Sequence, residues 1–306
     1  MKIAVIGAGA MGSIFGGHLA EAGEDVTFID IYKEHMDKIA QNGLFLEFPD
    51  GKIKVIKGIK TATSPKGLPK MDLIIIFVKS TVTKEAAKEA KELVKDDTLF
   101  LTLQNGLGNG EAIAEIVGEE KVLLGVTTCG GTFLEAGKVR FAGKGDTFIG
   151  GLIVGEERVK PIVEMFNKAG LPTYYRKDVM GLIWDKLFIN VAINPVTAIT
   201  GLRNGELLNF EETRAIMKGL IEEAVRVASK KGIKRDSEEV YNHTLDVAKK
   251  TAKNMSSMLQ DITRKRKTEI DTINGKIVEY GKETGVKTPY NEIVTYLVKT
   301  LEKKNK

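Results

Sequence analysis

The chain has little of the chemistry that forms covalent links or binds metals. Its single cysteine, Cys129, excludes an internal disulfide and favours a reducing compartment. The histidines are scattered without the spacing of metal ligands, so we expect no metal site. No apolar run approaches the ~20 residues of a membrane helix, and residues 2–6 already read as a strand. These absences predict a soluble, cytoplasmic protein without a signal peptide or a membrane span.

A strong excess of either charge is also missing. The 46 lysines and arginines stand against 41 aspartates and glutamates, which leaves a net charge of +5. Apart from the Lys-rich C-terminus, the main concentration is residues 264–267, which could contact phosphates or form an exposed helix face. With so mild an excess, we expect a small-molecule substrate as partner rather than nucleic acid or a membrane. A homodimer is left open.

The first half of the chain alternates strands with helices. Its strands include continuous apolar runs, as expected where helices cover both faces of a sheet. This order predicts a Rossmann-type doubly wound α/β sheet, which we place in residues 1–176. Residues 132–151 alternate more weakly and contain several glycines, which predicts antiparallel strands at the sheet edge. Other strands are expected at 2–6, 25–29, 72–78, 99–103, 122–127 and 173–175, with a hairpin at 43–57.

The second half contains helical patterns and no convincing strand. We therefore expect a mostly α-helical second domain over residues 177–306. A ligand is expected in a cleft between the two domains. The predicted helices cover residues 179–200, 205–231, 236–253, 257–283 and 289–304.

The segment Gly7-Ala8-Gly9-Ala10-Met11-Gly12 is a G-x-G-x-x-G pattern at the first strand-to-helix turn. Such glycines allow a tight turn, close approach of the backbone to a pyrophosphate and close helix–strand packing, with the helix N-terminus facing the phosphates. Asp30 ends the second strand, where its carboxylate can accept hydrogen bonds from ribose hydroxyls or serve as a turn residue. Because this carboxylate would repel a 2′-phosphate, the sequence favours NAD(H) over NADP(H).

Two further strand ends carry polar side chains. Lys79 follows the strand at 72–78, and Asn105 follows the strand at 99–103. The carboxyl ends of parallel strands form the binding edge of a dinucleotide-binding sheet. We therefore expect Lys79 near the dinucleotide and Asn105 near the nicotinamide or a substrate carbonyl, although each alone could be loop chemistry.

Three polar residues spaced four apart, Lys186, Asn190 and Asn194, lie in an otherwise apolar segment. On a helix they project from one face, and their neighbours predict a helix buried nearly all round. Buried amines and amides need partners, because each unpaired group costs about 1–3 kcal/mol. The row is either an internal polar network or, as we favour, a ligand-facing row. In that case Lys186 donates a proton to a developing alkoxide and the amides orient a small polar substrate.

Other polar candidates lie farther along the second half. Asn204 follows a short loop and is either a turn residue, an N-cap or a ligand contact. Asn254 and Ser257 are one turn apart on a plausible helix, and Glu269 is three turns farther along it. Neutral hydroxyl and amide donors suit a carboxylate or hydroxyl group of a small substrate.

Taken in order, these motifs resemble the ketopantoate reductase (2-dehydropantoate 2-reductase) family over essentially the whole chain. The resemblance implies reduction of ketopantoate to pantoate by hydride transfer from a nicotinamide cofactor, in pantothenate and coenzyme A biosynthesis. Besides the glycine-rich turn it rests on Gln-Asn-Gly at 104–106, Lys-x3-Asn-x3-Asn-Pro at 186–195, Asn-Gly-Glu-Leu at 204–207, Ser-Ser-Met-Leu-Gln-Asp at 256–261 and Thr-Glu-Ile-Asp at 268–271.

The same resemblance implies roles for single residues. Lys186 is the general acid, Asn105 lies between nicotinamide and substrate, and Lys79 and Glu269 belong to the cofactor side. The familiar members use NADPH and have a basic residue where this chain has Asp30, so the chain departs from them in its cofactor signal. Contacts with ketopantoate or pantoate are implied for Asn190, Asn194, Asn204 and Ser257, with Asn254 as a further candidate.

Two other functions are compatible with the first half of the sequence. A different two-domain dehydrogenase, for another 2-keto acid, a 3-hydroxy acid or a polyol phosphate, would need its own lysine and substrate anchors. A non-catalytic sensor would bind NADH without turnover and would not require Lys186 to meet the nicotinamide. Assays with a panel of 2-keto and 3-hydroxy acids separate these functions.

Overall fold

The computed structural model describes residues 1–143 and 145–304. Contacts divide the chain into two compact units. The first comprises Met1–Gln104 and Asn109–Val179, and the second comprises Asn105–Gly108 and Met180–Lys306. The domain boundary after residue 176 stays a prediction, and no sequence pattern indicates that the loop 105–108 packs with the second unit.

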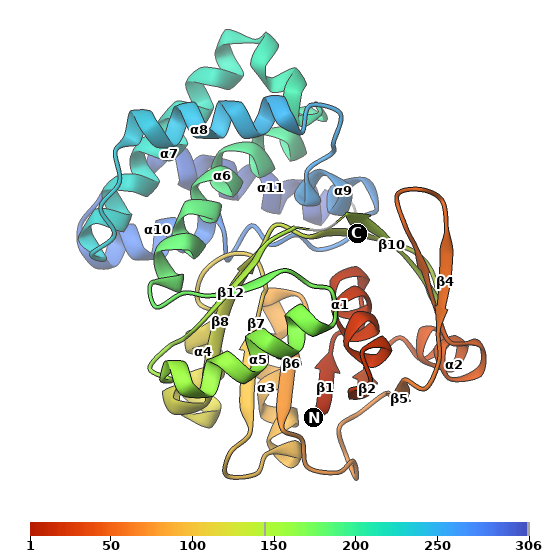
Figure 1. Cartoon of the computed structure of the whole chain (residues 1–306). Helices are drawn as coiled ribbons and strands as arrows, with labels where there is room; N and C mark the ends of the chain where they lie inside the picture. The colour runs from red at the N-terminus through yellow and green to blue at the C-terminus, as the bar shows by residue number, and fades with distance from the viewer. Residues whose placement is uncertain (144, 305–306) are drawn as a thin grey trace. The chain divides into compact units, whose positions relative to one another are not determined.

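The first unit is built on an eight-stranded sheet with the order β12-β11-β8-β7-β6-β1-β2-β5 (Figure 1). Neighbouring strands are parallel except for β11 and β8, in agreement with the predicted α/β class. The short, polar edge strand β5 is not indicated by the sequence pattern. The strands are β1 Lys2–Ile6, β2 Asp25–Ile29, β5 Lys60–Ala62, β6 Leu73–Ile76, β7 Leu99–Thr102, β8 Val122–Thr127, β11 Thr147–Gly151 and β12 Thr173–Tyr175.

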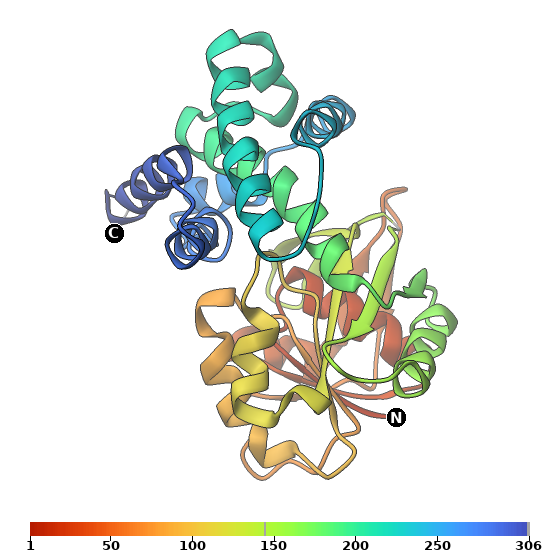
Figure 2. The ribbon, with the colours of Figure 1, turned by 90° about the vertical axis from the view of Figure 1, so that its left-hand side faces the viewer.

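Helices cover both faces of this sheet, which explains why its central strands are buried on both sides. Figure 2 shows α3 and α4, in orange and yellow, on the opposite side of the sheet from the green helix α5. Helix α1 shares the face of α5, because the rings of Phe15 and Phe166 are 5.8 Å apart. The helices are α1 Ala10–Glu21, α2 Lys33–Asn42, α3 Thr83–Ala90, α4 Asn109–Val117 and α5 Glu156–Lys168, with 3-10 turns η1 Ser80–Val82, η2 Lys91–Leu93 and η3 Glu119–Lys121.

A second sheet of the first unit has the order β4-β3-β10-β9. The predicted hairpin is present as β3 and β4, but the prediction for residues 132–151 is partly wrong, because only β11 joins the main sheet. The reason is packing: Leu44, Leu46, Val139 and Phe141 bury one face of the second sheet in the core that also holds Phe15 of α1. The strands are β3 Leu44–Glu47, β4 Ile53–Ile56, β9 Gly130–Glu135 and β10 Lys138–Gly143.

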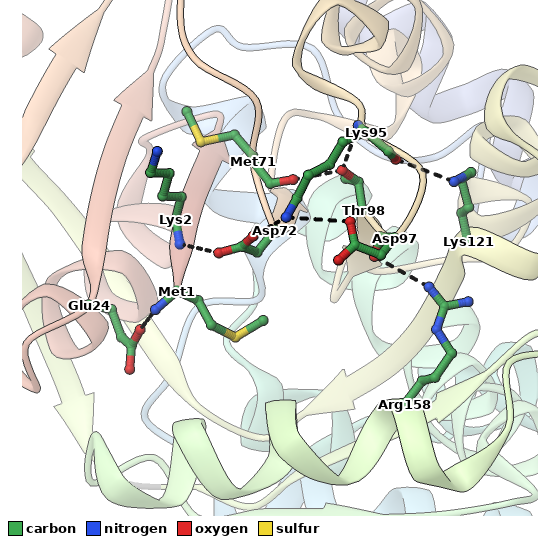
Figure 3. Close-up of polar contacts among 10 residues, drawn as sticks. All are labelled: Met1, Lys2, Glu24, Met71, Asp72, Lys95, Asp97, Thr98, Lys121 and Arg158. Carbon is green, nitrogen blue, oxygen red and sulfur yellow. Dashed lines mark hydrogen bonds and ion pairs between the residues drawn. The ribbon is translucent and has the colours of Figure 1, made fainter.

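Polar contacts close the end of the main sheet at which β1, β6 and β7 begin (Figure 3). The Lys2 backbone N–H donates to Asp72 Oδ2 at 2.6 Å, and Lys95 Nζ lies 2.5 Å from Asp72 Oδ1. The Lys95 ammonium, followed by the Lys2 hydrogen bond, lowers the pKa of the Asp72 carboxyl. Thr98 Oγ1 donates to the Met71 carbonyl at 2.6 Å. These contacts are structural, whereas the candidate residues of this unit follow the opposite, carboxyl ends of the strands.

The second unit is helical (Figure 1), as the sequence predicts. One predicted helix starts differently: the segment from residue 205 begins as a 3-10 turn, η4, before α7. The elements are α6 Val179–Thr200, η4 Asn204–Asn209, α7 Glu211–Lys230, α8 Ser237–Lys250, α9 Ser257–Thr263, α10 Asn274–Thr284 and α11 Pro289–Lys304.

The predicted helix over 257–283 is wrong, because the structure breaks it into α9 and α10. Helix α9 ends in a reversal in which Arg266 N–H donates to the Asp261 carbonyl at 2.8 Å and Lys265 N–H donates to the Ile262 carbonyl at 3.1 Å. This Schellman-type end needs a left-handed residue, and Lys265 supplies it with φ 55°. Glycine usually fills that position, so the sequence contains no stop signal here. Glu269 therefore lies in the irregular segment between the two helices.

Helix α6 also corrects the expectation that no apolar run is long enough to cross a membrane. Its 22 residues are sufficiently long and apolar, but 61% of its most apolar window is buried inside the protein. Leu187, Phe188 and Val191 are at most 1% exposed and belong to the core of the second unit. We read α6 as the central helix of that unit.

Candidate functional site

The glycine-rich turn has the geometry of a backbone cradle. Gly7 has φ +92°, and a Cβ there would lie 2.5 Å from the backbone nitrogen of Val78. A Cβ at Gly12 would collide with the Gly7 carbonyl oxygen, whereas a Cβ at Gly9 would meet no atom within 4 Å. Gly7 and Gly12 are therefore required by close packing, and the exposed Gly9 leaves the N-terminus of α1 open. Backbone N–H groups at such an N-terminus suit the pyrophosphate of a dinucleotide.

Asp30 is tied to this turn. Its Oδ2 accepts the Ala8 N–H at 2.7 Å, and its Oδ1 accepts the Tyr32 N–H at 2.9 Å. Asp30 is half-buried and directly follows β2. Each carboxylate oxygen can accept more than one hydrogen bond. The residue therefore shapes the turn while retaining the capacity to accept ribose hydroxyls.

His35 contacts the backbone of the glycine-rich turn through its side chain. No spacing in the sequence indicates this contact. Its Nδ1 accepts the Gly137 N–H at 2.8 Å, so the ring proton of the neutral form resides on Nε2. Nε2 lies 2.9 Å from the Ala8 carbonyl and 3.2 Å from Ser13 Oγ. The side chain is 1% exposed, and burial lowers its pKa. His35 thus joins the glycine-rich turn to the second sheet only while it is neutral.

This arrangement predicts acid sensitivity. In the unfolded chain His35 has the ordinary histidine pKa of about 6.5, and burial lowers this pKa in the folded protein. The contribution of neutral His35 to the free energy of unfolding is therefore fully present above about pH 6.5 and decreases as the pH falls below that value. The loss is at most about 1.4 kcal/mol per pH unit for one group. We expect His35→Gln, which keeps an amide donor for Ala8, to lose less stability than wild type between about pH 6.5 and pH 5. Urea unfolding at each pH checks this, and equal losses in both proteins would contradict it.

Lys79 follows β6 and is exposed at the start of η1. Gln104, which is part of the Gln-Asn-Gly motif but was not among the predicted site residues, organises this segment. Its Nε2 donates to the Val78 carbonyl at 2.5 Å and to Thr83 Oγ1 at 2.9 Å. The ends of β6 and β7 are thereby fastened together at the carboxyl edge of the sheet.

The loop 105–108 packs on the irregular segment between α9 and α10. Gly106 has φ +83°, and a Cβ there would lie 2.5 Å from the Thr272 carbonyl oxygen. Leu107 N–H donates to the same carbonyl at 3.0 Å. As a result Asn105 Nδ2 lies 3.3 Å from Glu269 Oε2, although the two residues are 164 positions apart. Two of the predicted site residues are thus brought into contact within the second unit.

The row Lys186, Asn190 and Asn194 lies on one face of α6. Lys186 and Asn190 are half-buried, and Asn194 is 6% exposed. A helix buried nearly all round is therefore correct for residues 191–198 and wrong for the first half, where other residues are also partly exposed. Burial therefore increases along the row, from the half-buried Lys186 to the buried Asn194.

The remaining candidates surround the start of α9. Asn204 N–H donates to the Asn254 carbonyl at 3.1 Å, and Asn204 Nδ2 donates to Thr251 Oγ1 at 2.9 Å. Among residues 1–143 and 145–304, none provides a hydrogen bond to the buried Asn204 Oδ1. Asn254 and Ser257 are exposed, and Asn254 precedes the helix rather than lying on it. Asn204 is therefore a turn residue with one acceptor left over.

Ser256 is the N-cap of α9 and connects this helix to the backbone of Asn194 through Thr197. Its Oγ accepts the Leu259 N–H at 3.1 Å and lies 2.6 Å from Thr197 Oγ1. Thr197 Oγ1 donates in turn to the Asn194 carbonyl at 2.9 Å. Ser256 was not among the predicted site residues, although serine at a helix start is a typical N-cap signal.

The combination of these features agrees with the family models that match the chain. Residues 3–152 match the model described as ketopantoate reductase PanE/ApbA, and residues 178–302 match its C-terminal model. The chain belongs to the ketopantoate reductase family. A 2-dehydropantoate 2-reductase of Pyrococcus horikoshii is 41% identical over 305 residues, which cover 99% of this chain and 98% of that protein. One of Halobacterium salinarum is 34% identical and covered to 99% in both chains.

Solved structures agree with this assignment to the ketopantoate reductase family. A PanE/ApbA family ketopantoate reductase from Ralstonia eutropha matches with TM-score 0.92 and 32% identity, covering 100% of this chain and 99% of that one. A D-mandelate dehydrogenase with NADH and anilino(oxo)acetate matches with TM-score 0.94, 31% identity and the same coverage. The protein is thus an oxidoreductase with a Rossmann-type site for a nicotinamide cofactor.

Proposed function

We propose that this ketopantoate reductase family member reduces ketopantoate to pantoate with a reduced nicotinamide cofactor, as a step of pantothenate and coenzyme A biosynthesis. The observation that carries the proposal is the row Lys186, Asn190 and Asn194 on α6, in a chain whose relatives are named 2-dehydropantoate 2-reductase over full length. The test is oxidation of the cofactor, followed by its absorbance, on addition of ketopantoate. If ketopantoate is reduced neither with NADH nor with NADPH, the proposal is wrong.

The cofactor, when bound, supplies the hydride, and the protein supplies orientation and a proton. Gly7–Gly12 would hold the pyrophosphate at the N-terminus of α1, and Asp30 would accept the ribose hydroxyls, with Lys79 at the same edge of the sheet. Lys186 Nζ donates a proton to the ketone oxygen as negative charge develops there. The position of Lys186 supports this role, because the residue is half-buried and lies on a helix whose apolar residues belong to the core of the second unit.

The organic acid is held by amide and hydroxyl groups of the second unit. Asn105 Nδ2 donates to Glu269 Oε2, so the two act as one hydrogen-bonded pair. In the proposed site Asn105 would contact the nicotinamide and the substrate, and Glu269 would contact the cofactor. The position of Asn204 supports its inclusion, since its N–H donates to the carbonyl of Asn254, another candidate, at 3.1 Å. The proposed substrate contacts are Asn190, Asn194, Asn204, Asn254 and Ser257.

We further propose that the cofactor is NAD(H) in preference to NADP(H). The support is the position of Asp30, whose two oxygens face the glycine-rich turn and the following backbone at the end of β2. A carboxylate there would repel a 2′-phosphate, although Lys33 could partly compensate.

A second candidate is reduction of another 2-keto acid. It is favoured by one observation, the TM-score of 0.94 to a D-mandelate dehydrogenase that carries NADH. Comparing kcat/KM for ketopantoate with the values for phenylglyoxylate and for branched aliphatic 2-keto acids separates the two candidates. A higher value for an aromatic 2-keto acid would displace ketopantoate as the substrate.

Substrate anchoring provides a further prediction. Asn190→Ala and Ser257→Ala should each raise KM for ketopantoate while KM for the cofactor changes little, because both side chains are assigned to the acid. A hydrogen bond to a charged group contributes about 1.5–3 kcal/mol, or roughly tenfold to a hundredfold in KM. Steady-state kinetics with each substrate varied in turn checks this. Unchanged KM for ketopantoate with weakened cofactor binding would reverse the assignment.

We also propose that the protein is soluble and cytoplasmic, with α6 in its core rather than in a membrane. A homodimer stays a prediction. Light scattering on the purified protein measures the assembly directly.

A further inference from the structure

Pro195 leaves one carbonyl of α6 without its helical partner. In an α-helix the N–H of each residue donates to the carbonyl four residues earlier, and proline has no N–H. The carbonyl affected is that of Val191, which stands directly after Asn190 and three residues before Asn194. Val191 is fully buried, so bulk water cannot replace the missing donor.

Asn274, the first residue of α10, provides that donor. Its Nδ2 donates to the Val191 carbonyl oxygen at 2.9 Å, and both residues are 0% exposed. Because a carbonyl oxygen only accepts, this contact also determines which end of the Asn274 amide is the nitrogen. The amide thus replaces an N–H that the sequence of α6 lacks.

The Asn274 amide is itself held in place by a buried network. Its Nδ2 also donates to Asn291 Oδ1 at 3.0 Å, while Asn291 Nδ2 donates to Glu223 Oε2 at 2.8 Å and to the Leu220 carbonyl at 3.2 Å. Asn291 is 0% exposed and Glu223 is 2% exposed. A side chain fixed by buried partners on two other helices cannot follow α6 if α6 moves.

Glu223 completes the network at the N-terminus of α11. Its Oε1 accepts the Tyr290 N–H and its Oε2 accepts the Asn291 N–H, each at 2.9 Å. A carboxylate at this place satisfies N–H groups that have no partner within the helix. The contacts therefore join α6, α7, α10 and α11 through buried polar groups.

We propose that Asn274 is a positioning residue that fixes the turn of α6 between Asn190 and Asn194. This role rests on the proposed function of the row as the substrate-binding and proton-donating face. Without Asn274 the Val191 carbonyl has no donor, and α6 relaxes around Pro195 toward another partner. The amides of Asn190 and Asn194 move with that turn, so substrate contacts weaken while the cofactor cradle in the other unit is unaffected.

The test is a double-mutant cycle between Asn274→Ala and Pro195→Ala. Alanine at 195 restores an N–H for the Val191 carbonyl inside the helix, so the double variant no longer needs Asn274. We expect Asn274→Ala to raise KM for the keto acid about tenfold, with KM for the cofactor within about twofold. The double variant should recover most of that loss. Absence of recovery would overturn the proposal, because it would show that the Val191 carbonyl is not the cause.

Amide hydrogen exchange gives a readout that is independent of activity. Peptides covering residues 186–194 should exchange faster in Asn274→Ala and return toward wild type in the double variant. Thr244→Val is the matched control, because Thr244 is 0% exposed and its hydroxyl donates only to Val240 of its own helix. We expect Thr244→Val to lower the free energy of unfolding while amide hydrogen exchange in α6 stays as slow as in the wild type. Equal exchange in Asn274→Ala and wild type would refute the positioning role.

The two readouts separate this inference from the proposed function. If Lys186→Ala retains turnover, the row is not catalytic, yet the exchange cycle still decides whether Asn274 holds α6. If Asn274→Ala is too unstable to purify, the double variant compared with Pro195→Ala supplies the same answer. In that comparison the removal of Asn274 should have a small effect, and a large loss of keto-acid affinity would contradict the proposal.

Discussion

Lys186→Ala should lower kcat/KM for ketopantoate by about 10²- to 10⁴-fold, the usual contribution of a positioned general acid. Lys186 lies on a core helix and is half-buried, so its removal leaves the apolar packing of Leu187 and Phe188 in place. Binding of the reduced cofactor, measured by its fluorescence, should change little because the glycine-rich turn belongs to the other unit. We therefore expect the loss in kcat and in kcat/KM for ketopantoate, and not in the affinity for the cofactor.

Lys186→Arg distinguishes proton donation from charge. Arginine keeps a positive charge and hydrogen-bond donors, but its guanidinium does not release a proton at neutral pH. We expect the arginine variant to bind ketopantoate better than the alanine variant and to remain slow. Unfolding by urea shows whether either variant is folded. Near-normal turnover in a folded Lys186→Ala protein would remove Lys186 from the mechanism.

The second large effect should be cofactor choice, with a kcat/KM for NADH about tenfold or more above that for NADPH. Two like charges at ~4 Å repel by about 4 kcal/mol at an effective dielectric of 20, and relaxation or Lys33 would reduce this. Asp30 is held by Ala8 and Tyr32, so it cannot swing freely away from a 2′-phosphate. A higher kcat/KM with NADPH in the wild-type protein would refute the role of Asp30 as the ribose carboxylate.

The structure improves the design of the variants for this test. Asp30→Ala would remove two backbone contacts together with the charge, whereas Asp30→Asn removes the charge and keeps one acceptor for the Ala8 N–H. Ile31→Arg adds a phosphate partner at a residue that is 92% exposed, where a change costs little stability. We expect Asp30→Asn with Ile31→Arg to relax or reverse the preference, and Ile31→Arg alone to change it less. Steady-state kinetics with both cofactors measures the ratio.

Features that depend on local sequence pattern could be predicted before the structure. The glycine-rich turn lies between β1 and α1, because its position after an apolar strand leaves little freedom in how it folds. Helix α6 runs over Val179–Thr200 as its pattern predicts, and the spacing of four places Lys186, Asn190 and Asn194 on one face. The α/β class and the helical second half follow from the same periodicities.

Contacts between segments that are distant in the sequence became visible only in the folded protein. Asn105 contacts Glu269 because Gly106 packs on Thr272, and a residue pair 164 positions apart has no signal in a single sequence. The break between α9 and α10 depends on the left-handed Lys265, which lacks the glycine that usually marks such an end. β9 and β10 leave the main sheet because their apolar face is buried with α1. His35 and Asn274 gained their roles only when folding brought backbone groups of other elements to them, and Ser256 met the Thr197 hydroxyl of α6 in the same way.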